Sequence, residues 1–129
     1  MRTFQVHSPG ATGNAWARIS QPARWHEWAP HVRGAWGLGR QVRPGDRGAV
    51  RLLGAIPVPV EIIRVESGRS WSWRVAGVAE MDHRVEPRDG GCTVAIDLRA
   101  PAPLEAGLAL AYGPVIRATL RRLATASAT

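Results

Sequence analysis

The sequence of 129 residues contains no lysine, so all 17 of its basic side chains are arginines. This absence excludes catalysis through a lysine Schiff base, and it excludes a phosphate-binding loop that ends in Gly-Lys-Ser or Gly-Lys-Thr. Cysteine is almost absent as well. The single Cys92 has no partner for an internal disulfide, which suits a reducing compartment, and we expect a cytoplasmic protein.

Long apolar runs and metal-binding motifs are also missing. No stretch approaches the roughly 20 apolar residues of a membrane-spanning helix. The opening residues, MRTFQVHSPG, lack the apolar run of a signal peptide. The four histidines and the cysteine form no CxxC, HExxH or HxH pattern, and no GxGxxG or GxSxG motif occurs. We therefore expect no membrane span, no metal and no cofactor.

The net charge of +7 comes from arginines that are scattered from Arg2 to Arg122. A surface that binds nucleic acid usually concentrates its charge in a patch or stripe, so we expect no specific nucleic-acid partner. Arg117, Arg121 and Arg122 come closest to a cluster. An alternative explanation for these three is that they complement the negative end of a helix dipole.

Most of the chain has the pattern of short antiparallel strands. Segments 70–75, 79–86 and 92–98 alternate apolar and polar residues, as strands with one covered face do. Turn signals such as Arg43-Pro44-Gly45-Asp46 join neighbouring segments, which predicts hairpins. Two short helices are expected after the first strand: 15–19, capped by Asn14 or Thr12, and a second that begins at Pro22. The predicted strands are 3–7, 32–38, 48–53, 56–66, 70–75, 79–86 and 92–98.

Segment 101–126 has a helical period instead. At 100° per residue its apolar side chains fall in one broad stripe, with Arg117 and Arg121 opposite. The stripe keeps its phase across Pro114, which predicts one kinked helix, and the alternative is a break between two helices. Leu110 lies opposite the stripe and is a candidate for a dimer contact, so both a monomer and a homodimer remain open. The stripe consists of Leu104, Leu108, Ala111, Tyr112, Val115, Ile116, Thr119 and Leu123.

Five short motifs accompany these elements in order: AW at 15–16, WHEWAP at 25–30, VRPG at 42–45, VESGRSWSWR at 65–74 and YGPVI at 112–116. Motifs and element order together resemble the helix-grip fold of the START-like superfamily, also known as the SRPBCC or birch-pollen-allergen-like fold. The local match is closest to its polyketide cyclase/dehydrase group. The resemblance implies a single α+β domain over residues 1–129. In that fold, a curved antiparallel sheet wraps around a long C-terminal helix, with two short helices after the first strand.

The helix-grip fold leaves a cavity between the sheet and the last helix, and the alternation predicts which side chains line it. Trp25 and Trp28 share one face of a short helix, where they form a lid at the cavity mouth, pin the helix on the sheet, or do both. The facing of Glu61 and Arg64 stays open, because adjacent isoleucines at 62 and 63 interrupt the alternation. The predicted wall comprises Trp71, Trp73, Val75, Met81, His83, Val85, Val94 and Ile96 from the sheet and Leu108, Tyr112, Val115 and Ile116 from the helix.

This predicted wall is more polar than a plain core requires, and apolar walls with a few polar groups are typical of small-molecule sites. The alternative is a filled core in which the polar groups bond to one another or to buried water. His83 is central: it is either a general acid or base or a neutral, hydrogen-bonded core histidine. The predicted ligand-binding residues are Trp25, Trp28, Trp71, Trp73, Met81, His83, Val94, Leu108, Tyr112, Val115 and Ile116.

The function predicted from these features is the binding of a hydrophobic molecule, aromatic or polycyclic, in the internal cavity. Members of the resembled group range from cyclases and aromatases to carriers of lipids and other apolar ligands, so an enzyme that cyclises or dehydrates a polyketide-like chain is the alternative. In that case His83, Tyr112 or Arg64 would transfer protons or stabilise an oxyanion. A third possibility is a regulatory or protein-interaction module with a filled core and an exposed apolar patch.

Overall fold

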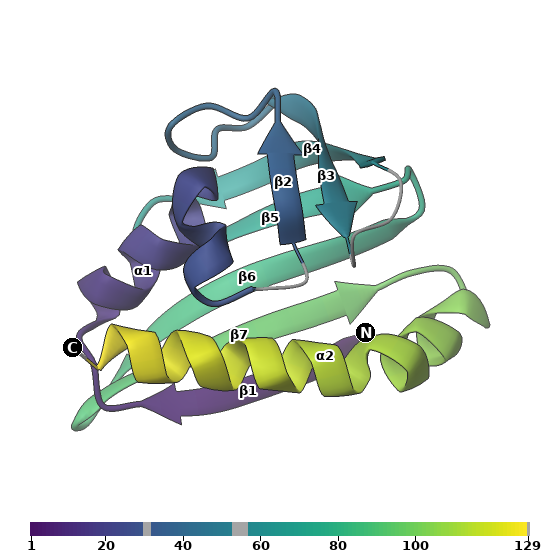
Figure 1. The fold of residues 1–129 in the computed structure, drawn as a ribbon. Helices are drawn as coiled ribbons and strands as arrows, with labels where there is room; N and C mark the ends of the chain where they lie inside the picture. Colours follow the sequence, from purple (N-terminus) through teal and green to yellow (C-terminus); the bar gives the residue numbers. More distant parts are fainter. Residues whose placement is uncertain (30–31, 53–56, 129) are drawn as a thin grey trace.

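The computed structural model describes residues 1–29, 32–52 and 57–128. Its main element is a seven-stranded antiparallel sheet in the order β1-β7-β6-β5-β4-β3-β2 (Figure 1). Helix α1 (Thr12–Ser20) and the 3-10 helix η1 (Pro22–Glu27) follow the first strand, and α2 (Leu104–Ser127) ends the chain. The strands are β1 (Arg2–Ser8), β2 (Val32–Trp36), β3 (Arg47–Leu52), β4 (Pro57–Glu66), β5 (Ser70–Val75), β6 (Ala79–Arg88) and β7 (Gly91–Arg99). The predicted α+β helix-grip fold is confirmed.

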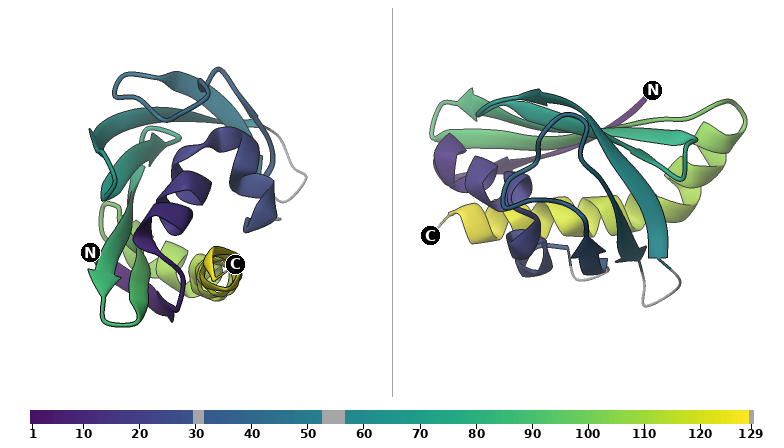
Figure 2. Two further views of the ribbon diagram at one scale, coloured as in Figure 1. Left: turned by 90° about the vertical axis from the view of Figure 1, so that its left-hand side faces the viewer. Right: turned by 90° about the horizontal axis from the view of Figure 1, so that it is seen from above.

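The sheet curves around α2, which lies along its concave side (Figure 2). Strands β2 to β7 pair in chain order because short turns join most of them. Strand β1 forms the opposite edge of the sheet from β2 and pairs with β7. Within that pair, Phe4 opposes Ile96 and Val6 opposes Val94. Helix α2 packs chiefly on β1 and β7, while α1 packs on β6 and η1 packs beside β2. The concave side therefore holds the core.

A bulge in β4 determines which way Glu61 and Arg64 face, a point that the sequence left open. Ile62 opposes Trp73 and Arg64 opposes Ser72, so Ile63 is the extra residue. A bulge of this kind changes the phase of alternation along one strand. Before the bulge, Ile62 is fully buried; after it, Arg64 is exposed. Both Glu61 and Arg64 consequently point away from the core.

Helix α2 is one continuous helix that contains Pro114, as predicted. Figure 2 shows that its axis changes direction in the first half. Pro114 is exposed, and its ring opens the solvent side of the helix, so the helix bends toward the sheet. The expected stripe is correct except at Leu104 and Ala111, which are exposed, and it omits Leu120, which is fully buried.

The first strand, α1 and the end of α2 meet at one tight corner. The Ser8 hydroxyl donates to the Ala124 carbonyl at 2.7 Å and accepts from the Gly10 amide at 3.1 Å. A Cβ on Gly10 would lie 1.8 Å from the Ser127 carbonyl oxygen, so only glycine allows this approach. Helix α1 begins with Ala11 as its N-cap residue and no side-chain cap, so the expected capping by Asn14 or Thr12 was wrong.

Candidate ligand-binding cavity

A cavity of about 280 Å³ lies between the sheet and α2. It is lined by ten of the eleven predicted ligand-binding residues. The exception is Val94, which is fully buried and faces the packed core instead. Val85 belongs to the same packed layer and also lies off the wall. The ten are Trp25, Trp28, Trp71, Trp73, Met81, His83, Leu108, Tyr112, Val115 and Ile116.

The mouth of the cavity includes residues that the sequence did not single out. Val58 comes from the start of β4, and Ala76 and Val78 come from the turn between β5 and β6. Leu104, in the first turn of α2, also lines the cavity and is 40% exposed. Turn residues follow no alternation, so periodicity had no means of finding Ala76 and Val78.

Three tryptophans of the wall are fixed by the C-terminal end of α1. The indole N–H groups of Trp25 and Trp71 donate to the same acceptor, the Ile19 carbonyl, at 2.9 and 2.8 Å. The Trp28 indole donates to the Arg18 carbonyl at 3.0 Å. The last carbonyls of a helix lack partners within the helix, so these indoles supply the missing donors. Their polar ends are thereby turned to α1, and their rings face the cavity.

The wall is built around a column of parallel rings. Trp25 stacks on Trp71 with ring centroids 5.5 Å apart, and Trp71 stacks on His83 with centroids 3.9 Å apart. Trp73 stands nearly perpendicular to all three, at centroid distances of 5.3 to 5.5 Å. Edge-to-face and offset-stacked contacts are the favourable arrangements for such rings. The Trp73 indole N–H is buried and has no hydrogen-bond partner among the residues that the structure describes.

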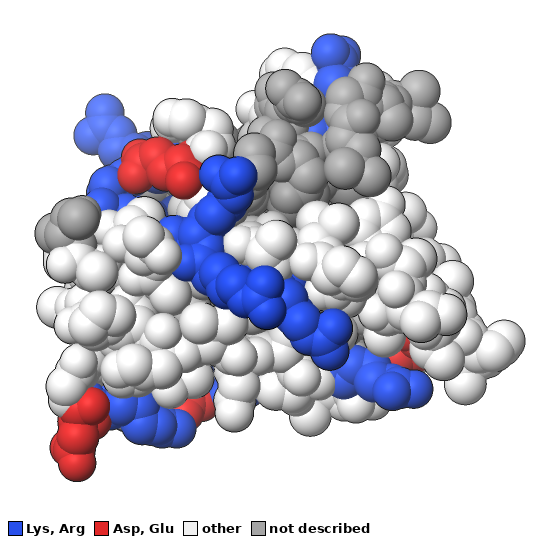
Figure 3. Space-filling model, turned by 60° about the horizontal axis from the view of Figure 1, so that its bottom comes forward, with Lys and Arg blue, Asp and Glu red and all other residues white. Residues whose placement is uncertain are grey.

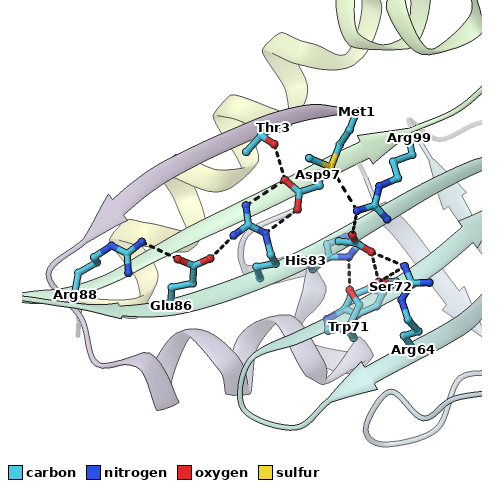
Figure 4. Close-up of polar contacts among 12 residues, drawn as sticks. Met1, Thr3, Arg64, Trp71, Ser72, His83, Glu86, Arg88, Asp97 and Arg99 are labelled. Atoms are coloured by element: carbon cyan, nitrogen blue, oxygen red, sulfur yellow. Dashed lines mark hydrogen bonds and ion pairs between the residues drawn. The ribbon is translucent and has the colours of Figure 1, made fainter. Parts of the chain in front are cut away.

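His83 is buried in this column and is neutral. Its Nδ1 lies 3.3 Å from the Trp71 carbonyl oxygen (Figure 4). Burial lowers the pKa of His83 to about 4, although the Trp71 carbonyl opposes this effect. Because a carbonyl only accepts, Nδ1 carries the proton and Nε2 is left as an acceptor. No hydrogen bond to Nε2 occurs among the described residues.

Tyr112 and Thr119 contribute two hydroxyl groups to the same cavity from α2. Tyr112 is half-buried, and Thr119 is buried. The cavity therefore brings His83 and Tyr112 together on facing walls, one on the sheet and one on the helix. Apart from these polar groups and the tryptophan rings, the wall consists of aliphatic and methionine side chains.

Arg64 lies outside the cavity, so its inclusion with His83 and Tyr112 was wrong. Its guanidinium sits on the convex face of the sheet, 3.2 Å from Asp82 (Figure 4). The Ser72 hydroxyl contacts the same carboxylate, and Arg99 reaches it at 3.1 Å from the other side. The β4 bulge is the physical reason, because it turns Arg64 outward.

The rest of the convex face carries alternating charges. Arg84 donates to Asp97 at 2.7 Å and also contacts Glu86 (Figure 4). Burial opposes ionisation of Asp97, but hydrogen bonds from Arg84 and Thr3 outweigh it and lower the pKa of the carboxyl. Within the part of the chain that the structure describes, no group of three metal-ligating side chains lies together. This face carries a ladder of ion pairs along the sheet.

Comparison with known proteins supports what the geometry suggests. The sequence matches, over residues 3–128, the family model described as polyketide cyclase / dehydrase and lipid transport. The chain belongs to this family. The predicted membership of the SRPBCC superfamily is thereby confirmed. The description of the polyketide cyclase family joins enzymes with carriers, so membership alone does not choose between them.

Solved structures share the fold at low sequence identity. An AHSA1-like protein from Aeromonas hydrophila superposes with a TM-score of 0.75 at 15% identity, covering 99% of this chain and 94% of that protein. A polyketide-cyclase-like protein from Corynebacterium glutamicum has a TM-score of 0.66 at 17% identity, covering 95% and 88%. DynU16, from the dynemicin biosynthetic locus, has 0.70 at 17% identity; the match covers 97% of this chain but 47% of DynU16. Among curated proteins no sequence matches.

Proposed function

We propose that this cyclase-family protein binds a compact, mostly apolar aromatic molecule in the cavity between the sheet and α2. The observation that carries the proposal is the wall itself: a cavity of about 280 Å³ lined by four tryptophans, His83 and aliphatic side chains. Drug-sized ligands occupy cavities of roughly 300–1,000 Å³ with such walls, so a ligand of two or three fused rings suits this one. The alternative of a filled core finds no support in a cavity of this size.

The free Nε2 of His83 supports a further feature of the ligand. Since Nε2 accepts and does not donate at neutral pH, it suits a ligand that presents a hydroxyl group. The Tyr112 hydroxyl either donates or accepts, so it is less selective. A hydrogen bond of this kind adds about 1 kcal/mol, which corresponds to about fivefold in affinity. We therefore propose a phenolic or hydroxylated ring system as the ligand class.

The test compares 2-naphthol with naphthalene, which lacks only the hydroxyl. Binding is measured by quenching of tryptophan fluorescence, since three tryptophans flank the cavity in contact with one another. We expect 2-naphthol to bind about fivefold more tightly and the preference to vanish in His83→Phe. Leu108→Trp fills the cavity and should abolish binding. Leu110→Trp, on the opposite face of α2, is the matched control and should bind normally. Equal binding to both α2 variants would contradict the proposal.

A second candidate is a cyclase or dehydratase, and the presence of both His83 and Tyr112 on the cavity wall favours it. Neutral His83 would accept a proton from the carbon next to a ketone, while the Tyr112 hydroxyl hydrogen-bonds to the developing enolate oxygen. Loss of a β-hydroxyl completes a dehydration when protonated His83 returns the proton to the departing hydroxide, which leaves as water. Tyr112→Phe separates the two functions: an enzyme loses turnover with little change in binding, whereas a carrier has no turnover to lose.

A further inference from the structure

Arginines without an ion-pair partner among the described residues gather on one face of the molecule. Figure 3 shows a stripe of basic side chains that crosses the face formed by α2. Four exposed arginines belong to this region: Arg117, Arg121 and Arg122 on α2, and Arg2 on the neighbouring strand β1. We call them the arginine stripe. None of the four has an ion-pair partner among the described residues.

The contacts between β1 and α2 explain why Arg2 joins the stripe. The N-terminal amine pairs with Glu105 at the start of α2, and the Arg117 guanidinium lies 5.0 Å above the ring of Phe4. The strand and the helix thus run side by side in the same direction. Glu105 is the only acidic residue of α2, and the N-terminal amine already pairs with it. The stripe is therefore uncompensated.

A helix dipole does not account for the stripe. The last turn of α2 contains no basic residue, and Arg122 lies five positions before the helix end at Ser127. The dipole acts within the last turn. The three arginines of α2 thus stay exposed without an ion-pair partner among the described residues, and the contact of Arg117 with the Phe4 ring does not explain Arg121 and Arg122.

Exposed apolar side chains accompany the stripe. Leu110 is 83% exposed and precedes Arg117 and Arg121 by seven and eleven residues, so all three lie on one helix face. At the same end of α2, Leu104 and Val78 stand at the cavity mouth and are 40% and 51% exposed. These are three of the five exposed large hydrophobic side chains among the described residues. Leu110 and the arginine stripe thus share the outer side of α2, away from the side that lines the cavity, and the cavity mouth lies at the same end of the helix as Leu110.

We propose that the outer side of α2 docks on an anionic lipid bilayer, which places the cavity mouth beside the membrane surface. Arginine pairs with lipid phosphates, and leucine and valine enter the boundary between headgroups and acyl chains. Among the residues that the structure describes, no helix is long and apolar enough to cross a membrane, so the docking is peripheral. The purpose of the docking rests on the proposed function, because an apolar ligand concentrates in a membrane. The existence of the docking surface does not depend on the proposed function.

Other occupants fit the face less well. A nucleic acid would pair with the arginines but would leave Leu110, Leu104 and Val78 in water. A second copy related by a two-fold axis would place like charges against each other across the interface. A bilayer with anionic headgroups complements both the charge and the exposed apolar side chains.

The test is co-sedimentation of the full chain with vesicles of phosphatidylcholine containing 30% phosphatidylglycerol, compared with pure phosphatidylcholine. We expect binding to the anionic vesicles only. The double variant Arg121→Gln/Arg122→Gln should bind about thirtyfold more weakly, since each basic residue near an anionic surface contributes about fivefold. Leu110→Ser should weaken binding while leaving the charge unchanged.

The matched control is Arg40→Gln/Arg43→Gln, which has the same net charge but alters the loop between β2 and β3, away from α2 (Figure 1). We expect it to bind vesicles like the wild type. Equal losses in the two double variants would overturn the proposal, because net charge alone would then explain the binding. So would wild-type protein that ignores anionic vesicles, or that binds a 20-nucleotide single-stranded DNA more tightly than the vesicles. Binding of 2-naphthol without vesicles should be unchanged in both double variants, which separates failure of docking from failure of the cavity.

Discussion

His83 gives the cavity a chemical character that no aliphatic residue would provide. Its ring stacks on Trp71, its Nδ1 is held by the Trp71 carbonyl, and its Nε2 is free among the described residues. A pKa near 4 keeps it neutral at physiological pH. Before any reaction, it is thus a hydrogen-bond acceptor or a base at pH 7, which fits both roles that the sequence allowed.

The lowered pKa of His83 predicts how stability depends on pH. An unfolded histidine has a pKa of about 6.5, so between pH 6.5 and 4 the unfolded state binds a proton that the folded state excludes. The free energy of unfolding therefore decreases as the pH is lowered through this window, by about 2 kcal/mol between pH 7 and pH 5. Urea denaturation at both pH values measures the difference. His83→Phe should lose less unfolding free energy between pH 7 and pH 5, because it has no histidine at this position. An equal decrease in the wild type and the variant would contradict the lowered pKa of His83.

The cost of one strained residue can be tested at the turn between β5 and β6. Ala76 has φ of 54° and Gly77 has φ of 72°, and the Val78 amide closes the turn on the Val75 carbonyl. Alanine disfavours positive φ, whereas asparagine before glycine is the usual choice in such turns. We expect Ala76→Asn to stabilise the fold by about 0.5–1 kcal/mol. Ala106 is an exposed residue of helix α2, where asparagine is less favourable than alanine. We expect Ala106→Asn to destabilise the fold by a similar amount, and thermal unfolding of both variants measures the two effects.

Elements with clean periodicity could be predicted from the sequence, and those shaped by other parts of the chain could not. The bounds of β5 were predicted without error, because Trp71 and Trp73 alternate with polar residues. The bulge in β4 depends on pairing with β5, so pattern alone did not place Arg64. Likewise, the C-terminal end of α1 is held by indoles that come from η1 and β5. Such contacts form only once distant segments meet.

In the candidate site, too, periodicity predicted some features, whereas others depend on contacts between distant segments. Strand and helix periodicity found ten residues of the cavity wall, because both sheet and helix turn one face inward. Val94 obeys the same periodicity and is fully buried, but it does not line the cavity. Periodicity reports which face is buried, whereas the position of a void along that face depends on where α2 bends.

At the scale of the molecule, we infer that residues 1–129 fold as one domain, since the corner around Gly10 ties β1, α1 and α2 together. The Ser8 hydroxyl, the Ala124 carbonyl and the Gly10 amide form its hydrogen bonds. Gly13, three residues on, lies in α1 with nothing within 4 Å of an added Cβ. The two glycines therefore make a matched pair: one position is closed to a methyl group and the other is open.

Gly10→Ala should destabilise the protein by about 2–3 kcal/mol, because its Cβ would meet the Ser127 carbonyl oxygen and the backbones would have to separate. Gly13→Ala should stabilise it by up to about 1 kcal/mol, since alanine favours the helix. Urea titrations followed by far-ultraviolet circular dichroism and by tryptophan fluorescence measure both variants. If the chain is one cooperative unit, the two probes report the same midpoint in each protein. A Gly10→Ala variant in which helix signal is lost before the tryptophan signal would instead show that α2 unfolds separately from the cavity wall on the sheet.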